Sequence, residues 1–140
     1  MKKFWWKLAL VLLSVFVVAT VAQAEIVVIA NEAVPIDSLN QNEMKDIFLG
    51  KTAKWSDKSR VRFAVLTGET HQDFLRAYIK RTPSQYRIYW KKMVFTGKAS
   101  KPKSFASEAD LVKYVSQTDG AIGYISGDTD TDGTKVLAVN

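Results

Sequence analysis

The sequence predicts an α/β fold, with a mixed sheet that carries helices on both faces. Short runs of β-branched and apolar residues alternate along the chain with segments of helical periodicity, which is typical of layered α/β domains. Helix-capping signatures precede the helical segments. The chain has 140 residues, which, less an N-terminal export signal, suffice for one hydrophobic core but not for two. We therefore expect a single domain.

The export signal is predicted at residues 1–24. Three lysines precede an apolar run over residues 8–21, and Ala22-Gln23-Ala24 then supplies the small-x-small pattern that signal peptidase accepts. The alternative is an uncleaved transmembrane anchor, but the apolar run is shorter than the ~20 residues that span a bilayer. We expect cleavage after Ala24 and a periplasmic domain over residues 25–140.

The domain left after cleavage is nearly balanced in charge. Removing 24 of the 140 residues leaves 116 and takes away three lysines, so the formal net charge falls from +6 to +3. The chain contains no cysteine, which excludes a disulfide, a thiol nucleophile and a thiolate metal site. The stability of the domain must therefore come from its hydrophobic core.

The first expected strand covers residues 26–30, a β-branched apolar run that ends before a turn at Pro35. A helix is predicted next. Asn40 is its expected N-cap and Glu43 its third residue, which is the spacing of a capping box, and the helix ends before Gly50.

Three further strands are expected at residues 62–66, 121–125 and 136–139, each an apolar run bounded by turn residues. A helix follows the first of them directly. Thr70 and Asp73 have the spacing of a capping box for this helix. The residues on its apolar face are Phe74, Leu75, Tyr78 and Ile79.

Two more helices complete the pattern. Thr82 is the expected N-cap of one, with Pro83 at its first position and Gln85 at its third, and Ser107 and Asp110 have capping-box spacing at the start of the other. The residues at helical spacing on their apolar faces are Tyr86, Tyr89, Trp90, Met93 and Val94 in the first, and Leu111, Val112 and Val115 in the second.

Two motifs resemble the periplasmic phosphate-binding proteins of phosphate ABC importers. They are DIFLGK at residues 46–51, followed by Trp55, and GAIGY at residues 120–124. Their order and spacing agree with that family over most of residues 25–140. The resemblance implies a type II periplasmic-binding-protein-like fold, in which two α/β lobes close on an anion. This sequence matches a single lobe of that fold.

The resemblance also implies a ligand-binding site at the junction between the strand at residues 62–66 and the following helix. In the family, an Arg and a Ser-Gly-Thr run at this junction hold the phosphate. Here Thr70 matches the family Thr, Gly68 falls at the Ser position, and Ala64 replaces the Arg. We therefore take Thr67, Gly68, Thr70 and His71 as the candidate ligand-binding residues.

Two interpretations of this junction remain open. Free amides at a helix start and the helix dipole favour an anion there. Alternatively, Thr70 caps the helix and the junction binds nothing. Glu69 favours the second interpretation, because its carboxylate repels phosphate unless it points away.

A basic segment covers residues 76–103, where no acidic residue occurs. Its members are Arg76, Lys80, Arg81, Arg87, Lys91, Lys92, Lys98, Lys101 and Lys103. Such a segment is compatible with an anionic membrane surface, an acidic protein partner, the steering of anions, or a merely solvated helix face. Its aromatic residues have helical spacing, which indicates core packing, and we expect no nucleic-acid partner.

Two other features are weaker. Residues 128–133 (DTDTDG) copy the opening of a calcium-binding loop, but Val139 stands at the twelfth position, where a bidentate Glu is required. We interpret this segment as an acidic turn. His71 is the chain's one histidine, with no partner set for a catalytic triad or a zinc site around it in the sequence, so we expect neither metal nor cofactor.

Together these observations predict a non-enzymatic periplasmic protein that is similar to the substrate-binding component of phosphate ABC transporters. It is expected to bind phosphate or a related oxyanion weakly, or to have an accessory role in phosphate uptake with an ABC importer or another envelope protein as partner. The alternative is an envelope interaction module with a vestigial anion site, whose basic segment contacts a membrane surface or a protein.

Overall fold

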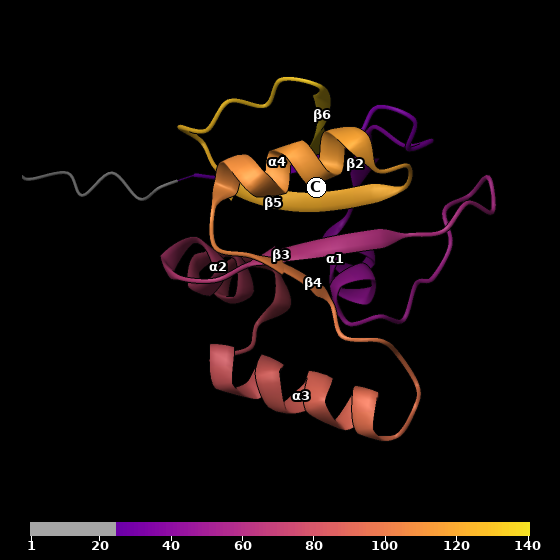
Figure 1. Cartoon of the computed structure of the whole chain (residues 1–140), viewed down its shortest axis with the longest axis vertical. Helices are drawn as coiled ribbons and strands as arrows, with labels where there is room; N and C mark the ends of the chain where they lie inside the picture. The colour runs from indigo at the N-terminus through magenta and orange to yellow at the C-terminus, as the bar shows by residue number, and fades with distance from the viewer. Residues whose placement is uncertain (1–24) are drawn as a thin grey trace, which may run out of the picture.

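The computed structural model describes residues 25–140 (Figure 1). The export signal expected at residues 1–24 lies outside the described residues. No helix within the described part of the chain has the length and apolar character needed to cross a membrane. The strands are β1 (Ile26–Asn31), β2 (Ser38–Leu39), β3 (Arg62–Leu66), β4 (Lys103–Phe105), β5 (Ala121–Ser126) and β6 (Thr134–Val139). The helices are α1 (Gln41–Phe48), α2 (Glu69–Phe74), the π-helical segment η1 (Leu75–Ile79), α3 (Pro83–Phe95) and α4 (Glu108–Gln117).

The described strands form one mixed sheet in the order β2-β6-β1-β5-β3-β4. The central strand β1 is antiparallel to both of its neighbours, β5 and β6. The pairs β3 with β5, β3 with β4, and β2 with β6 are parallel. The predicted α/β fold with a mixed sheet is confirmed.

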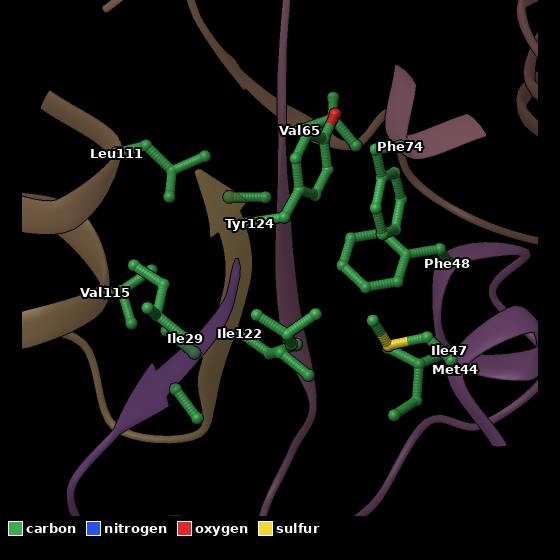
Figure 2. Packing of buried hydrophobic residues seen from close by; sticks show 14 of the residues in the cluster. Ile29, Met44, Ile47, Phe48, Val65, Phe74, Leu111, Val115, Ile122 and Tyr124 are labelled. Atoms are coloured by element: carbon green, nitrogen blue, oxygen red, sulfur yellow. The ribbon is translucent and has the colours of Figure 1, made fainter. Parts of the chain in front are cut away.

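Helices cover both faces of this sheet, as predicted. Figure 2 shows Leu111 and Val115 of α4 on one side of the central strands, and Phe48 of α1 with Phe74 of α2 on the other. The Tyr124 ring of β5 stacks on Phe74, with 3.8 Å between the ring centroids, and Phe48 meets Phe74 edge-on at 4.8 Å. Each of these side chains is fully buried.

The two reciprocal capping boxes expected at α1 and α3 are present. The Asn40 side chain accepts the Glu43 amide at 2.8 Å, and the Glu43 carboxylate accepts the Asn40 amide at 3.1 Å. Thr82 and Gln85 repeat the arrangement at α3. The capping is local in sequence, which is why residue spacing predicts it.

The prediction of a capping box formed by Thr70 and Asp73 is wrong. The N-cap of α2 is Gly68, with φ +104°, and no side chain caps the helix there. Thr70 is therefore the second residue of the helix, two residues too late to serve as its N-cap. The helix then passes into η1 and ends at Lys80, whose φ is +61°.

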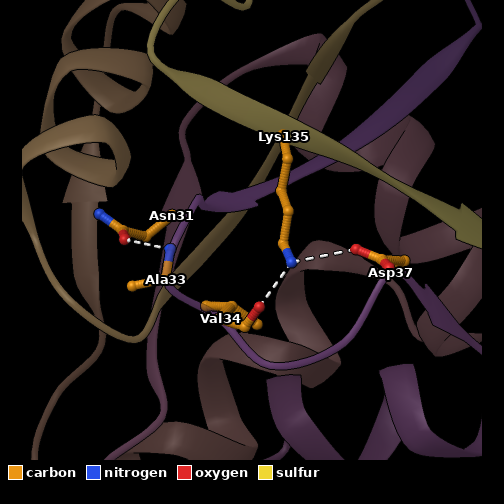
Figure 3. Close-up of polar contacts among 5 residues, drawn as sticks. All are labelled: Asn31, Ala33, Val34, Asp37 and Lys135. Atoms are coloured by element: carbon orange, nitrogen blue, oxygen red, sulfur yellow. Dashed lines mark hydrogen bonds and ion pairs between the residues drawn. The ribbon is translucent and has the colours of Figure 1, made fainter.

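Polar ties hold the end of β1 and the start of β6 in place (Figure 3). The buried Asn31 amide group donates to the Val115 carbonyl at 2.9 Å and accepts the Ala33 amide through Oδ1 at 2.9 Å. Lys135 Nζ donates to the Val34 carbonyl at 2.5 Å and lies 3.1 Å from the Asp37 carboxylate. Because the polar groups of Asn31 are paired, burying it carries no desolvation penalty of the kind an unpaired amide would incur.

Helix α3 lies apart from the sheet at the bottom of the view in Figure 1. Two tyrosine hydroxyls attach it to the end of α1: Tyr86 donates to the Phe48 carbonyl at 2.7 Å, and Tyr89 to the Leu49 carbonyl at 2.6 Å. Trp90 is buried beside them, as helical spacing predicted for the core. Val94 is not, because 43% of its surface remains exposed.

Candidate functional site

The candidate ligand-binding residues lie at the turn between β3 and α2. Thr67 and Gly68 are exposed, whereas Thr70 and His71 are partly buried in the first turn of α2. The Thr67 amide is not free to bind a ligand, because it donates a hydrogen bond to the Phe105 carbonyl of β4 at 3.0 Å. The turn is therefore anchored to the edge strand of the sheet.

The start of α2 presents backbone donors that no side chain caps. The first amide that closes back within the helix is that of Gln72, which donates to the Gly68 carbonyl at 3.2 Å. The amides of the three preceding residues have no intrahelical acceptor, as at any helix start. The first-turn amides and the positive end of the helix dipole make the turn locally favourable for negative charge.

The imidazole of His71 is held by a buried tyrosine. His71 Nδ1 lies 2.5 Å from Tyr124 Oη, which also accepts the Leu66 amide at 3.0 Å. The hydroxyl proton of Tyr124 has an acceptor only if it points to Nδ1, so neutral His71 carries its own proton on Nε2. His71 therefore presents an Nε2–H donor on the side of the ring opposite Tyr124.

Burial sets the protonation states of this pair. Desolvation lowers the pKa of His71 below its ordinary value of 6.5. Desolvation also raises the pKa of Tyr124, and the bond from the Leu66 amide opposes that shift only in part. At neutral pH both groups are uncharged, and the hydrogen bond joins two neutral partners.

This protonation state predicts a pH dependence of stability. The folded chain takes up a proton on His71 at lower pH than the unfolded chain, so the free energy of unfolding is full above pH 6.5 and falls as the pH drops from 6.5 to the folded pKa of His71. Urea unfolding at pH 7.5, 6.5, 6.0 and 5.5 measures it. His71→Gln keeps an acceptor for Tyr124 but does not titrate, so its stability should be flat over this window. An equal slope in both proteins would contradict the assignment, since the chain has no other histidine.

A large groove opens beside the turn, between it and α3. Its volume is about 1070 Å³, and three of the four candidate residues, Thr67, Gly68 and His71, line it. Neither Thr70 nor Glu69 does. Glu69 is therefore not part of the groove wall. Its carboxylate repels an anion bound in the groove less strongly than its position next to Gly68 in the sequence suggested.

The groove has an apolar floor and a basic rim. The apolar residues that line it are Val65, Leu66, Pro83, Tyr86, Trp90, Val94, Phe95 and Pro102. The basic residues are Arg87, Lys91, Lys92 and Lys101, and no acidic residue lines it. Sequence reasoning missed this floor, because its parts come from β3, α3 and the loop before β4 and show no common periodicity.

The basic segment thus divides into groups with different surroundings. Four of its nine members line the groove. Among the others, Arg76 pairs with Asp73 at 3.5 Å, Arg81 lies over the Tyr89 ring at 4.7 Å, and Lys103 over the Tyr114 ring at 6.0 Å. Both of the pairings over aromatic rings are short enough for a cation–π contribution.

The acidic segment at residues 128–133 forms the connection between β5 and β6. The Asp132 amide donates to the Asp130 carboxylate at 3.0 Å, which is a local turn contact. Within residues 25–140, no three acidic or histidine side chains converge in a way that would hold a metal ion.

Comparisons with known proteins identify the fold. No protein-family model matches the chain, and no curated protein matches it by sequence. Among solved structures, the chain is similar to a phosphate ABC transporter substrate-binding protein with bound phosphate from Clostridium perfringens (17% identity, TM-score 0.65), with 83% of this chain aligned to 45% of that one. It is also similar to an ABC-type phosphate transport receptor from Vibrio cholerae (16% identity, TM-score 0.56), with 83% of this chain aligned to 46% of that one. A third similar structure is a phosphate-binding protein from Stenotrophomonas maltophilia (18% identity, TM-score 0.61), with 84% of this chain aligned to 39% of that one.

The chain spans less than half the length of each of these proteins. At identities of 16–18%, the structural similarity establishes the fold and not the ligand. The resemblance seen in the sequence is confirmed at that level: residues 25–140 have the α/β fold of one lobe of the phosphate ABC transporter substrate-binding proteins.

Proposed function

We propose that this chain is a non-enzymatic periplasmic protein that binds phosphate or a related oxyanion weakly, in an accessory role in phosphate uptake. The observation that carries the proposal is the uncapped start of α2 beside a groove with no acidic lining residue. Thr67, Gly68, Thr70 and His71 are the proposed ligand residues. The named activity of the structural neighbours, one of which holds phosphate, supports the same ligand class.

The affinity is expected to be low for two physical reasons. Ala64 stands at the position where the family resemblance implies an Arg. It is fully buried in β3 and brings no charge to the anion. Thr67 and Gly68 in the turn are also exposed to solvent. An anion that keeps part of its hydration gains less from each hydrogen bond than one that is enclosed.

Calorimetry with inorganic phosphate tests this proposal. We expect a dissociation constant in the millimolar range, and about fivefold weaker binding after Thr67→Val or Thr70→Val, since one lost hydrogen bond is worth about 1 kcal/mol. Thr52→Val is the matched control, because Thr52 lies in the loop after α1 and belongs neither to the β3–α2 turn, nor to the first turn of α2, nor to the groove lining. Absence of heat at millimolar phosphate would overturn the proposal. An unchanged affinity in both site variants would overturn the assigned residues.

The alternative is an envelope interaction module that uses the basic segment. It is favoured by two exposed apolar side chains on α3, Ile88 at 65% and Phe95 at 92%, which stand among Arg87, Lys91 and Lys92. This function predicts co-sedimentation with anionic lipid vesicles that high salt abolishes, together with no heat of phosphate binding.

A further inference from the structure

The groove is built for more than an inorganic anion. A phosphate ion has no apolar surface, so it gains nothing from a floor made by Leu66, Tyr86 and Trp90. The groove volume of about 1070 Å³ lies at the upper end of the range for pockets that take drug-sized organic ligands. A bare oxyanion would leave most of this volume to water.

The lining also selects a charge. Arg87, Lys91 and Lys92 approach the groove from α3, and Lys101 approaches it from the loop before β4. No acidic residue lines the groove, although the chain contains 14 of them. Four cations beside an apolar, low-dielectric wall create a positive electrostatic potential, which favours the binding of an anionic group at the rim. The apolar part of the lining therefore fits an apolar group, and the basic part fits an anionic group of the same ligand.

We propose that the groove binds a single-chain amphiphilic organic anion, with its alkyl or aryl body on the apolar floor and its anionic headgroup among the basic rim residues and the β3–α2 turn. This inference rests on the proposed oxyanion binding for the headgroup and adds the class of molecule that carries it. Val94 and Phe95, exposed in the free chain at 43% and 92%, cover the apolar body of the ligand.

Three probes below their micelle concentrations separate the contributions of the two halves: inorganic phosphate, octyl phosphate and the uncharged octyl glucoside. We expect octyl phosphate to bind at least tenfold more tightly than inorganic phosphate. Burial of about two of the methylenes in its eight-carbon chain supplies that factor, at ~0.8 kcal/mol each. Octyl glucoside, which lacks the charge, should bind at least tenfold more weakly than octyl phosphate.

Matched surface variants locate the ligand on the protein. Val94→Ser combined with Phe95→Ser should weaken octyl phosphate about tenfold and leave inorganic phosphate unchanged. Ile88→Ser is the control, since Ile88 is an exposed apolar residue of the same helix that does not line the groove. Lys91→Gln combined with Lys92→Gln should weaken octyl phosphate, whereas Lys98→Gln, outside the groove, should not. The substituted side chains are all exposed, so the variants are expected to fold.

The outcomes distinguish this inference from the proposed function. Tight binding of octyl phosphate that the Ile88→Ser control retains supports the inference, even if inorganic phosphate gives no heat and the phosphate-uptake role fails. Measurable phosphate binding with no gain from the octyl chain overturns the inference and leaves the proposed function standing. Sedimentation of the protein as a dimer that the Val94 and Phe95 substitutions dissociate would also overturn it, because a second copy would then occupy the groove.

Discussion

Replacing Gly120 by alanine is expected to lower the free energy of unfolding by about 4 kcal/mol, which is exceptional for a single substitution. Gly120 has φ +77°, a conformation that costs an L-residue about 1–2 kcal/mol. An added Cβ would also stand 2.1 Å from the Arg60 carbonyl oxygen. The backbone cannot easily withdraw, because the Gly120 carbonyl accepts both the Arg62 amide and Trp55 Nε1 at 3.0 Å.

Urea unfolding of Gly120→Ala beside Gly97→Ala isolates the steric part of this effect. Gly97 has a similar φ of +70°, but nothing lies within 4 Å of the position of its added Cβ. We expect Gly97→Ala to cost about 1–2 kcal/mol, which is the conformational cost alone. Equal losses in the two variants would show that the region around Arg60 relaxes around the methyl group.

The second large effect is expected from Phe48→Ala, at about 3–5 kcal/mol. Phe48 is fully buried and contacts three aromatic rings: Phe63 at 5.3 Å, Phe74 at 4.8 Å and Tyr124 at 5.8 Å between centroids. Its removal leaves a cavity where α1, α2 and the sheet meet (Figure 2). The loss combines the transfer free energy of the ring with the dispersion contacts of the surrounding side chains.

Thermal or urea unfolding of Phe48→Ala measures this loss, with Phe95→Ala as the matched control. Phe95 is 92% exposed in the free chain, so its removal should change stability by no more than about 0.5 kcal/mol. A loss below about 2 kcal/mol for Phe48→Ala would mean that the core collapses into the cavity. Phe48 also supports Phe74 and Tyr124, so its loss should loosen the hydrogen bond between Tyr124 and His71 at the candidate site.

The sequence predicted those features that depend on neighbours in the chain. The capping boxes of α1 and α3 formed as expected because their partners are three residues apart. The strands at residues 26–30, 62–66, 121–125 and 136–139 were likewise predicted from apolar runs. The motifs at residues 46–51 and 120–124 indicated the fold correctly, since they encode packing: Phe48 and Tyr124 both lie at the centre of the core.

Features that depend on distant segments could be found only in the structure. Strand β4 has three residues and no alternating pattern, and it exists because β3 offers it a parallel edge. The N-cap of α2 is Gly68 and not Thr70, and the turn before the helix is held by the hydrogen bond from the Thr67 amide to the carbonyl of Phe105, a residue far along the chain. Neither contact leaves a signal in residue spacing.

In the candidate site, too, some features depend on neighbours in the chain and others on distant segments. By itself, the sequence determined the fold class, the turn at Thr67–Gly68 and the run of basic residues, because composition and short-range spacing are sufficient for each. Only the tertiary structure decided that Thr70 stands outside the groove, that Tyr124 orients His71, and that four of the basic residues meet an apolar floor. The physical reason is that a groove is a property of surfaces that long-range packing brings together, and no local pattern along the chain records it.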